Sequence, residues 1–215
     1  MISLRIVMPK DEKKIEKEYY GAGGMIWELI KIVLLAALVV VPIRIFLFQP
    51  FFVQGSSMEP NFEDKEYLII SEFGYKRTDV GFSYQDRDIN FFTVEPFKKL
   101  ERGDVAVFRY PKNPSQFFIK RIIALPGERI EIKDGRIKIY NSENPNGFVL
   151  EENYLSPSEE TPGEVIFNLT DNQYFVMGDN RKYSSDSRSW GPLLKDDIIG
   201  KVLLRAWPLS RAKIF

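Results

Sequence analysis

An apolar segment near the amino terminus constrains the fold of this chain more than any other feature. Residues 25–48 read MIWELIKIVLLAALVVVPIRIFLF, and their uninterrupted apolar centre covers residues 32–43. A helix rises about 1.5 Å per residue, so this segment is long enough to cross a hydrocarbon core of roughly 30 Å. Glu28, Lys31 and Arg44 stand near its ends, where long charged side chains can reach the interface. The segment therefore predicts one amino-terminal transmembrane helix.

Two other interpretations of this segment are a cleavable signal peptide and the buried helix of a soluble core. A signal peptide ends in small residues of the A-x-A type, whereas this run continues into FLFQPFF at residues 46–52. Aromatic residues on both sides, Trp27 before the run and several Phe after it, are typical of membrane interfaces. An uncleaved anchor is the preferred interpretation.

The distribution of Lys and Arg predicts the orientation of this anchor. Basic residues occupy positions 5, 10, 13, 14, 17 and 31 before the apolar centre, and only Arg44 follows it closely. Because basic residues near a span favour the cytoplasmic side, we expect residues 1–24 in the cytoplasm and 25–48 in the plasma membrane. Residues 49–215 then form an extracytoplasmic domain of a single-pass protein.

The residues after the anchor are predicted to form a mainly β domain. Short runs of β-branched and aromatic residues recur between turn signals at 67–72, 104–110, 117–124, 129–133, 136–140, 173–177 and 198–206. Asp134-Gly135, between two of these runs, is a strong hairpin signal. Residues 141–170, rich in Asn, Pro, Ser and Glu, are predicted to form a long loop. Residues 76–100 are predicted to form an inserted loop that lies on the surface or contacts the membrane.

Composition excludes several classes of chemistry. The chain contains no Cys and no His, which removes disulfides, thiolate nucleophiles, cysteine zinc sites and imidazole bases. Lys plus Arg equals Asp plus Glu, at 30 each, and this balance gives no electrostatic reason to expect nucleic acid as a partner. If the chain is a hydrolase, its base must be Lys, Asp, Glu or Tyr.

Three polar segments are candidates for a hydrolytic site, and each also has a purely structural interpretation. Residues 54–60, QGSSMEP, form a small-residue turn with two hydroxyls, which taken alone is typical of a plain turn. Lys120 interrupts an apolar strand, and strand alternation puts it on one face with Phe118 and Ile122. Burial lowers the pKa of a lysine and favours a neutral amine that can accept a serine proton, whereas a lysine at a solvated edge stays charged. Residues 178–191 fit either a polar surface loop or a loop that orients the base.

Four motifs in this order resemble those of the bacterial type I signal peptidases, also called leader peptidases. S-M-x-P occurs at residues 57–60, R-G-D-V-A-V-F at 102–108, K-R-x-x-x-L-P-G from Lys120 onward and G-D-N-R-x-x-S-x-D-S-R-x-W-G at 178–191. The resemblance implies a catalytic domain of coiled β-sheet joined to one amino-terminal transmembrane helix. It also implies a serine endopeptidase that removes signal peptides from exported preproteins, cutting after small residues of the A-x-A type.

The resemblance implies roles for individual residues. Ser57 would be the nucleophile and Lys120 its general base. Ser184 would hydrogen-bond to the lysine, and Asp186 and Arg188 would support the site.

The resemblance further implies a hydrophobic cleft that binds an extended peptide by strand pairing, with narrow S1 and S3 pockets that Val53 and Ile119 would line. Signal peptides and the lipid bilayer are the expected partners, nucleic acid is not, and no cofactor or metal is required. Gly55 occupies a position where some members carry a serine that donates to the oxyanion, so a second donor must come from the backbone or water. A self-cleaving Ser-Lys protease of the repressor type and an inactive anchored peptide-binding module are the alternatives.

Overall fold

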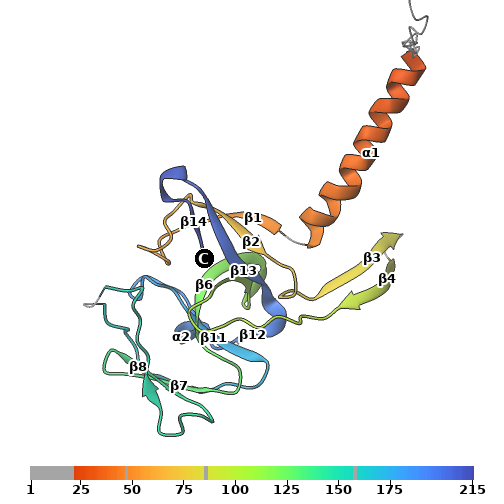
Figure 1. Ribbon diagram of the computed structural model, residues 1–215. Helices are drawn as coiled ribbons and strands as arrows, with labels where there is room; N and C mark the ends of the chain where they lie inside the picture. The colour runs from red at the N-terminus through yellow and green to blue at the C-terminus, as the bar shows by residue number, and fades with distance from the viewer. Residues whose placement is uncertain (1–21, 47, 85–86, 157–158) are drawn as a thin grey trace, which may run out of the picture. The chain divides into compact units, whose positions relative to one another are not determined.

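The computed structural model describes residues 22–46, 48–84, 87–156 and 159–215. The chain forms two compact units, residues 1–41 and 42–215, and each is described by itself. Helix α1 (Ala22–Phe46) contains one stretch, Gly23–Val40, that is long and apolar enough to cross a membrane (Figure 1). None of this stretch is buried within the described structure. Phe48, which the predicted anchor included, is the first residue of the strand that follows.

The second unit is built mainly from β-strands, as predicted, and their pairing is antiparallel. Its larger sheet has the order β1-β2-β13-β5-β6-β11-β12, with β14 added to β13. The strands are β1 (Phe48–Phe52), β2 (Tyr67–Ser71), β5 (Val105–Tyr110), β6 (Asn113–Ala124), β11 (Gln173–Met177), β12 (Leu193–Leu194), β13 (Ile198–Trp207) and β14 (Lys213–Ile214). The register of β13 shifts twice against β2 and once against β5. Such irregularities increase the local twist, which fits the predicted coiled sheet.

The described residues of the second unit also form a smaller sheet and three short helical segments. The small sheet has the order β10-β7-β8-β9. Its strands are β7 (Arg129–Lys133), β8 (Arg136–Tyr140), β9 (Phe148–Val149) and β10 (Val165–Asn168). The helical segments are α2 (Ser187–Trp190), η1 (Lys195–Asp197) and η2 (Leu209–Arg211).

The small sheet confirms one turn prediction and corrects one loop prediction. Asp134-Gly135 joins β7 to β8 as a hairpin, and both turn residues have positive φ, at 50° and 73°. The prediction of an uninterrupted loop over residues 141–170 is wrong, because β9 and β10 lie within it. Val165 and Phe167 pack against the buried cluster of the small sheet, and this long-range packing stabilises a strand too short to stand out in the sequence.

The inserted segment at residues 76–100 contains a two-stranded ribbon. Strands β3 (Thr78–Tyr84) and β4 (Arg87–Val94) pair antiparallel, with Thr78 opposite Val94. Among the described residues the ribbon pairs with no other strand, and Figure 1 shows it apart from the sheets of its unit. The β-branched and aromatic residues of β4 account for the strand conformation that the loop prediction missed.

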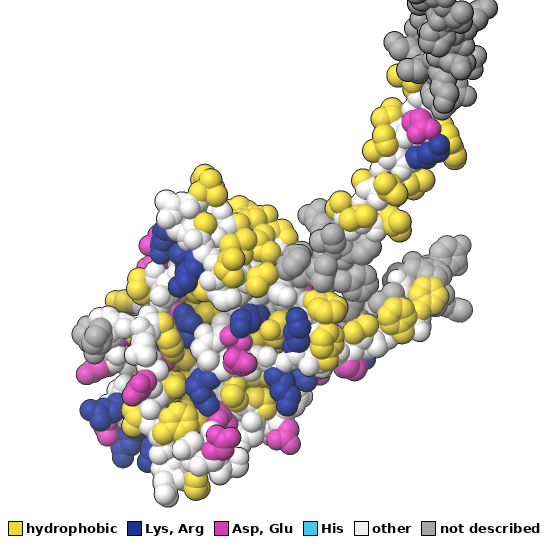
Figure 2. Space-filling view, viewed as in Figure 1, with side chains coloured by type: hydrophobic (Ala, Val, Ile, Leu, Met, Phe, Trp, Pro, Cys, Tyr) yellow, Lys and Arg dark blue, Asp and Glu magenta, His cyan; other side chains and the backbone are white. Residues whose placement is uncertain are grey.

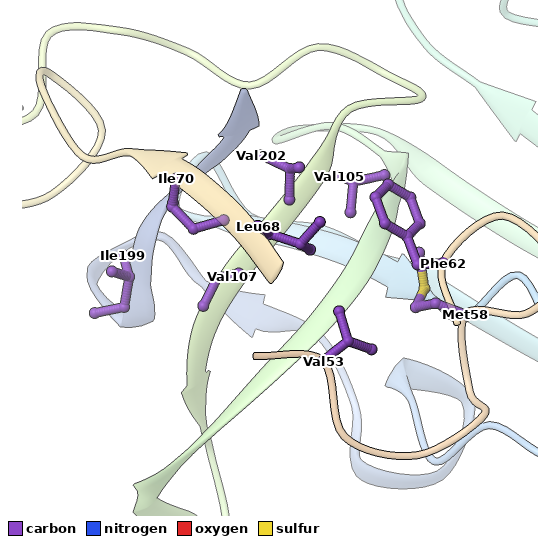
Figure 3. Close-up of a cluster of buried hydrophobic side chains, with 9 residues drawn as sticks. All are labelled: Val53, Met58, Phe62, Leu68, Ile70, Val105, Val107, Ile199 and Val202. Carbon is purple, nitrogen blue, oxygen red and sulfur yellow. The ribbon is translucent and has the colours of Figure 1, made fainter. Parts of the chain in front are cut away.

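Buried apolar side chains join these sheets in three clusters. One consists of Val53, Met58, Phe62, Leu68, Ile70, Val105, Val107, Ile199 and Val202, drawn in Figure 3. The second cluster joins the small sheet to β6 and β11 through residues such as Ile123, Ile130 and Phe175. The third, which includes Phe108 and Ile122, lies along β5, β6 and β11. The first cluster positions the candidate site, because Val53 and Met58 stand on either side of Ser57.

Candidate active site

Ser57 lies in a turn between β1 and β2 that is held at both ends. Val53 and Met58 are 4% and 1% exposed and belong to the cluster in Figure 3. Gly55 has φ 86°, in the region that favours glycine, and its N–H donates to Asp64 Oδ1 at 2.8 Å. The turn therefore holds Ser57 in a defined, partly exposed position.

Lys120 lies on β6 and contacts Ser57 directly. Its side chain is only 3% exposed, which confirms the predicted burial. Lys120 Nζ donates to Ser57 Oγ at 2.7 Å and to the carbonyl of Ile119 at 2.8 Å. The ring of Phe118, two residues earlier on the same face, lies with its centroid 5.4 Å from Nζ. The structure thus brings together the two residues expected to perform the chemistry.

Burial lowers the pKa of Lys120 from 10.5 to about 8. Desolvation is the largest cause, because an apolar surrounding disfavours the charged ammonium. Asp186 and Asp179 act in the opposite sense and raise the pKa. A substantial neutral fraction of Lys120 is consequently available slightly above neutral pH.

We expect the turnover rate to rise with pH across the range around 8. Only neutral Lys120 can accept the proton of Ser57, so the active fraction grows as the amine loses its proton near its pKa of about 8. The measurement is kcat for cleavage of a preprotein between pH 6 and 9.5, with folding checked at each pH. A profile that is flat over this range would contradict a lysine base with this pKa.

Asp186 and Arg188 form an ion pair beside the site. Asp186 is completely buried and accepts hydrogen bonds from Arg188 Nε at 2.8 Å and Arg188 Nη2 at 2.7 Å. Its carboxylate also accepts from the backbone N–H of Gly178 at 3.1 Å and caps α2. Arg188 Nη2 donates further to the carbonyl of Arg181 at 2.7 Å. These contacts tie the two ends of the segment 178–188 together.

Ser184 is the one predicted site residue whose expected contact is missing. The oxygen Ser184 Oγ is buried and has no hydrogen-bond partner among the described residues, so the expected hydrogen bond to Lys120 is not formed. A Cβ on Gly178 would lie 2.3 Å from both Ser184 Oγ and the Ser57 carbonyl oxygen. Ser184 therefore packs within a few ångströms of the nucleophile turn, and only glycine at position 178 leaves room for it.

Asn180 contacts the turn that carries Ser57, and local sequence patterns did not indicate this contact. Its backbone N–H donates to the Ser57 carbonyl and its side-chain amide donates to the Ser56 carbonyl, both at 3.1 Å. The residue thus binds the nucleophile turn to the segment 178–188. The only signal in the sequence was its place within the fourth motif.

Arg121 and Asp179 form a buried ion pair, which the sequence patterns did not predict. Arg121 Nε and Nη2 donate to the two oxygens of Asp179 at 2.8 and 2.5 Å. Asn61 Nδ2 donates to the same carboxylate at 3.0 Å, and Arg121 Nη1 donates to the Gly103 carbonyl at 2.8 Å. Because side chains alternate along a strand, Arg121 lies on the opposite face of β6 from Lys120. Asp179, which binds Arg121, is 58 residues away in the sequence, so local patterns do not reveal the pair.

A cleft of about 670 Å³ opens beside the Ser57–Lys120 pair. Residues 51–57 and 116–120 are among those that line it, so Val53 and Ile119 both lie on its walls as expected. Strand β11 pairs with β6 only from Arg121 to Ala124. One edge of β6 pairs with β5. At residues 116–119 the other edge therefore has no strand partner among the described residues. An extended peptide could pair with this edge.

No group of three or more His, Cys, Asp or Glu side chains that could hold a metal ion is present among the described residues. The residues with polar side chains that line the cleft beside Ser57 are Lys120, Gln54, Gln116, Tyr183 and serines. This set offers a hydroxyl and an amine for acyl transfer.

Comparison with known proteins identifies the family. Residues 26–207 match the family described as signal peptidase, peptidase S26. The probable signal peptidase I-2 of Synechocystis sp. is 32% identical over 190 residues, covering 86% of this chain and 74% of that protein. Signal peptidase I P of Bacillus subtilis subsp. natto is 33% identical over 208 residues, covering 92% and 97%. A crystal structure of a signal peptidase I from Enterococcus faecalis V583 is 32% identical, with a TM-score of 0.41, and the match covers 48% of this chain and 97% of that one. The chain belongs to the signal peptidase S26 family.

Proposed function

We propose that this protein is a signal peptidase I, a membrane-bound serine endopeptidase that removes signal peptides from exported preproteins through a Ser57–Lys120 dyad. The observation that carries the proposal is the 2.7 Å hydrogen bond between Lys120 Nζ and Ser57 Oγ, made by a lysine that is 3% exposed. Family membership supports the reaction class. Cleavage of a purified preprotein with an A-x-A site, lost in Ser57→Ala, is the direct test.

The geometry supports an acyl-transfer sequence with one proton carrier. Neutral Lys120 accepts the proton of Ser57 as Oγ attacks the carbonyl carbon of the scissile peptide bond. The resulting ammonium then protonates the leaving amine as the carbon–nitrogen bond breaks, which leaves an ester on Ser57. Lys120 next accepts a proton from water, the hydroxide attacks the ester, and the proton returns to Ser57 Oγ. Each step leaves Lys120 in the protonation state that the following step requires.

The developing oxyanion needs hydrogen-bond donors that do not have to be reorganised. The backbone N–H of Ser57 makes no hydrogen bond to another described residue and is our candidate for one donor. Gly55 has no side chain to supply a second, so we assign this to the backbone or to water. Asn180 supports the arrangement because its hydrogen bonds hold the carbonyls of Ser56 and Ser57.

Asp186 and Arg188 are proposed as positioning residues, and Ser184 as a residue that packs against the nucleophile turn. Asp186 also opposes the effect of burial on the pKa of Lys120. Its negative charge keeps that pKa near 8 rather than lower, so the amine can carry a proton at the moment the leaving group needs one.

We expect cleavage only after small residues. Val53 and Ile119 line the cleft beside Ser57, and we expect a large side chain placed before the scissile bond to clash with the packed strands that carry them. Replacing the residue before the cut by Phe, with the apolar region of the signal peptide unchanged, should abolish processing. Equal cleavage of the Ala and Phe substrates would contradict the proposed specificity.

We expect a single span with the amino terminus in the cytoplasm. Basic residues precede the apolar stretch of α1, and such residues favour the cytoplasmic side. In sealed membrane vesicles with their outer face exposed, added protease should digest the segment after Gln49 and spare residues 1–24. Protection of the carboxyl-terminal segment would show that the protein has the opposite orientation.

A further inference from the structure

The nucleophile turn, which covers residues 53–66 between β1 and β2, connects its second half to Ser57 by a short path. The Phe62 N–H donates to the carbonyl of Met58, the residue after Ser57, at 2.9 Å. Phe62 is fully buried and lies beside Met58 in the cluster of Figure 3. A displacement of Phe62 would therefore reach Ser57 through one hydrogen bond and one intervening residue.

Two arginines that are remote in the sequence bind this second half of the turn. They are Arg205 on β13 and Arg211, the last residue of η2. Arg205 Nη2 donates to the carbonyl of Asn61, and Arg211 Nη2 donates to the carbonyl of Pro60 at 3.3 Å. The two carbonyls that immediately precede Phe62 are therefore held from outside the turn.

A buried carboxylate holds the two arginines in place. Glu66 is 2% exposed, and its oxygens lie 2.9 Å from Arg205 Nε and 3.2 Å from Arg211 Nη1. Neither oxygen makes an aligned hydrogen bond to a described residue, so the two guanidinium charges are what compensates the buried negative charge. Arg211 also pairs with Glu63, which is more exposed. Figure 2 shows Lys or Arg side chains next to Asp or Glu side chains on the viewed face, around the place where Figure 1 draws β14.

The Arg205 guanidinium also lies against aromatic rings. Its Cζ atom is 5.1 Å from the ring centroid of Phe62 and 5.6 Å from that of Phe215. These two rings stack with centroids 4.9 Å apart. A guanidinium within about 6 Å of a ring centroid is attracted to the ring. Arg205 thus contacts both the side chain of Phe62 and the carbonyl that precedes it.

We propose that Arg205 and Arg211 are positioning residues for Ser57. They hold residues 60–62, and these residues keep Ser57 Oγ within reach of Lys120. Neither arginine is among the residues that line the cleft, so neither is expected to contact the substrate. The effect on cleavage rests on the proposed function, whereas the attachment of the nucleophile turn to the two arginines does not.

The two arginines give the nucleophile turn a second point of support. Asn180 holds the carbonyls of Ser56 and Ser57, whereas the arginines hold those of Pro60 and Asn61. A turn that is held at one place only can rotate about that place. A misplacement of about 1 Å at a catalytic group costs roughly a hundredfold in rate.

Arg205→Lys and Arg211→Ala test this proposal in the full chain. A lysine at position 205 keeps a positive charge for Glu66, but a single ammonium lacks the planar fork that also reaches the Asn61 carbonyl. The buried carboxylate therefore stays compensated, and the variant is expected to fold. Arg211→Ala removes the outer arginine and leaves Arg205 beside Glu66.

Arg129→Lys is the matched control. Arg129 also pairs with a carboxylate, that of Glu131 at 3.1 Å, and its Cζ atom lies 4.5 Å from the ring centroid of Tyr140. These residues belong to the small sheet, so the substitution weakens contacts of the same kind away from the nucleophile turn.

Both test variants are expected to lower kcat for preprotein cleavage at least tenfold per active site, while KM changes less than twofold and the midpoint of the pH profile stays at its wild-type value. Arg129→Lys should match the wild type. Complete acylation of Ser57 by a serine-reactive compound counts the active sites. Fewer active sites with a wild-type kcat per site would show a purely structural role and overturn the proposal. A shifted pH midpoint also overturns it, because the arginines would then act through Lys120.

Hydrogen exchange separates failure of this proposal from failure of the proposed function. Peptides that cover residues 58–62 are expected to exchange severalfold faster in Arg205→Lys and Arg211→Ala than in the wild type, and peptides from the small sheet should not change. Wild-type exchange over residues 58–62 overturns the attachment. If the wild type does not cleave a preprotein, the proposed function fails, and exchange still decides whether the arginines hold the turn. Thermal unfolding checks each variant, and either one decides alone if the other fails to fold.

Discussion

Lys120→Arg is expected to lower kcat for preprotein cleavage by several orders of magnitude. The guanidinium stays protonated throughout the pH range of the assay, so it cannot accept the proton of Ser57. Ser57→Ala should have an effect of the same size, because nucleophile and base act as a unit and losses of this kind are not additive. Single-turnover cleavage of a preprotein measures both variants. Lys182→Arg, on an exposed lysine of the neighbouring loop, is the matched control and should cleave at the wild-type rate.

A variant that removes the buried charge separates loss of catalysis from loss of folding. The folded-state pKa of Lys120, about 8, lies below its ordinary value of 10.5. The unfolded chain therefore binds the proton more tightly, and at pH 7 the folded state carries a penalty of up to about 3 kcal/mol that disappears as pH rises from about 8 to 10.5. The free energy of unfolding at pH 7 should accordingly be larger for Lys120→Met than for wild type. The variant should still be inactive. Near wild-type cleavage by Lys120→Arg or Lys120→Met would refute the dyad.

Gly178→Ala is expected to reduce kcat by about a hundredfold or more, since a misplacement of about 1 Å at a catalytic group costs on this order. The added Cβ would lie 2.3 Å from the carbonyl oxygen of Ser57, which is backbone and cannot rotate away. The nucleophile turn must therefore shift relative to Lys120. Rates of Ser57 acylation by a serine-reactive compound, expressed per folded molecule, measure the effect independently of substrate binding.

Gly200→Ala is the matched control for this variant. A Cβ at position 200 would lie 2.2 Å from the carbonyl oxygen of Ser71, so it creates a clash of the same kind between β13 and β2, away from Ser57. It should lower stability while the remaining folded protein acylates at the wild-type rate. If both glycine variants lose acylation only in proportion to their unfolded fraction, Gly178 has no specific role in positioning Ser57.

Local sequence patterns predicted much of the fold. Runs of β-branched and aromatic residues between turns correspond to strands such as β2, β5, β7 and β8, because alternation and turn chemistry act over a few residues. Strands β9 and β10 were missed because they are short and depend on pairing and packing within the small sheet. The β3–β4 ribbon was predicted as a loop because its segment was interpreted as an insertion, although both strands contain β-branched and aromatic residues.

The sequence by itself determined the chemistry available to this protein: without His or Cys, a serine hydrolase needs a base such as Lys120, and the apolar run before Phe48 predicts an anchor. Only the tertiary structure decided which groups meet. Ser57 and Lys120 are 63 residues apart, and Asn180 reaches the Ser56 carbonyl across 124 residues. Only the tertiary structure, likewise, shows that Ser184 Oγ has no hydrogen-bond partner among the described residues. Hydrophobic period and turn chemistry describe neighbours along the chain, whereas the distance between two remote side chains depends on how all the intervening strands pair and pack.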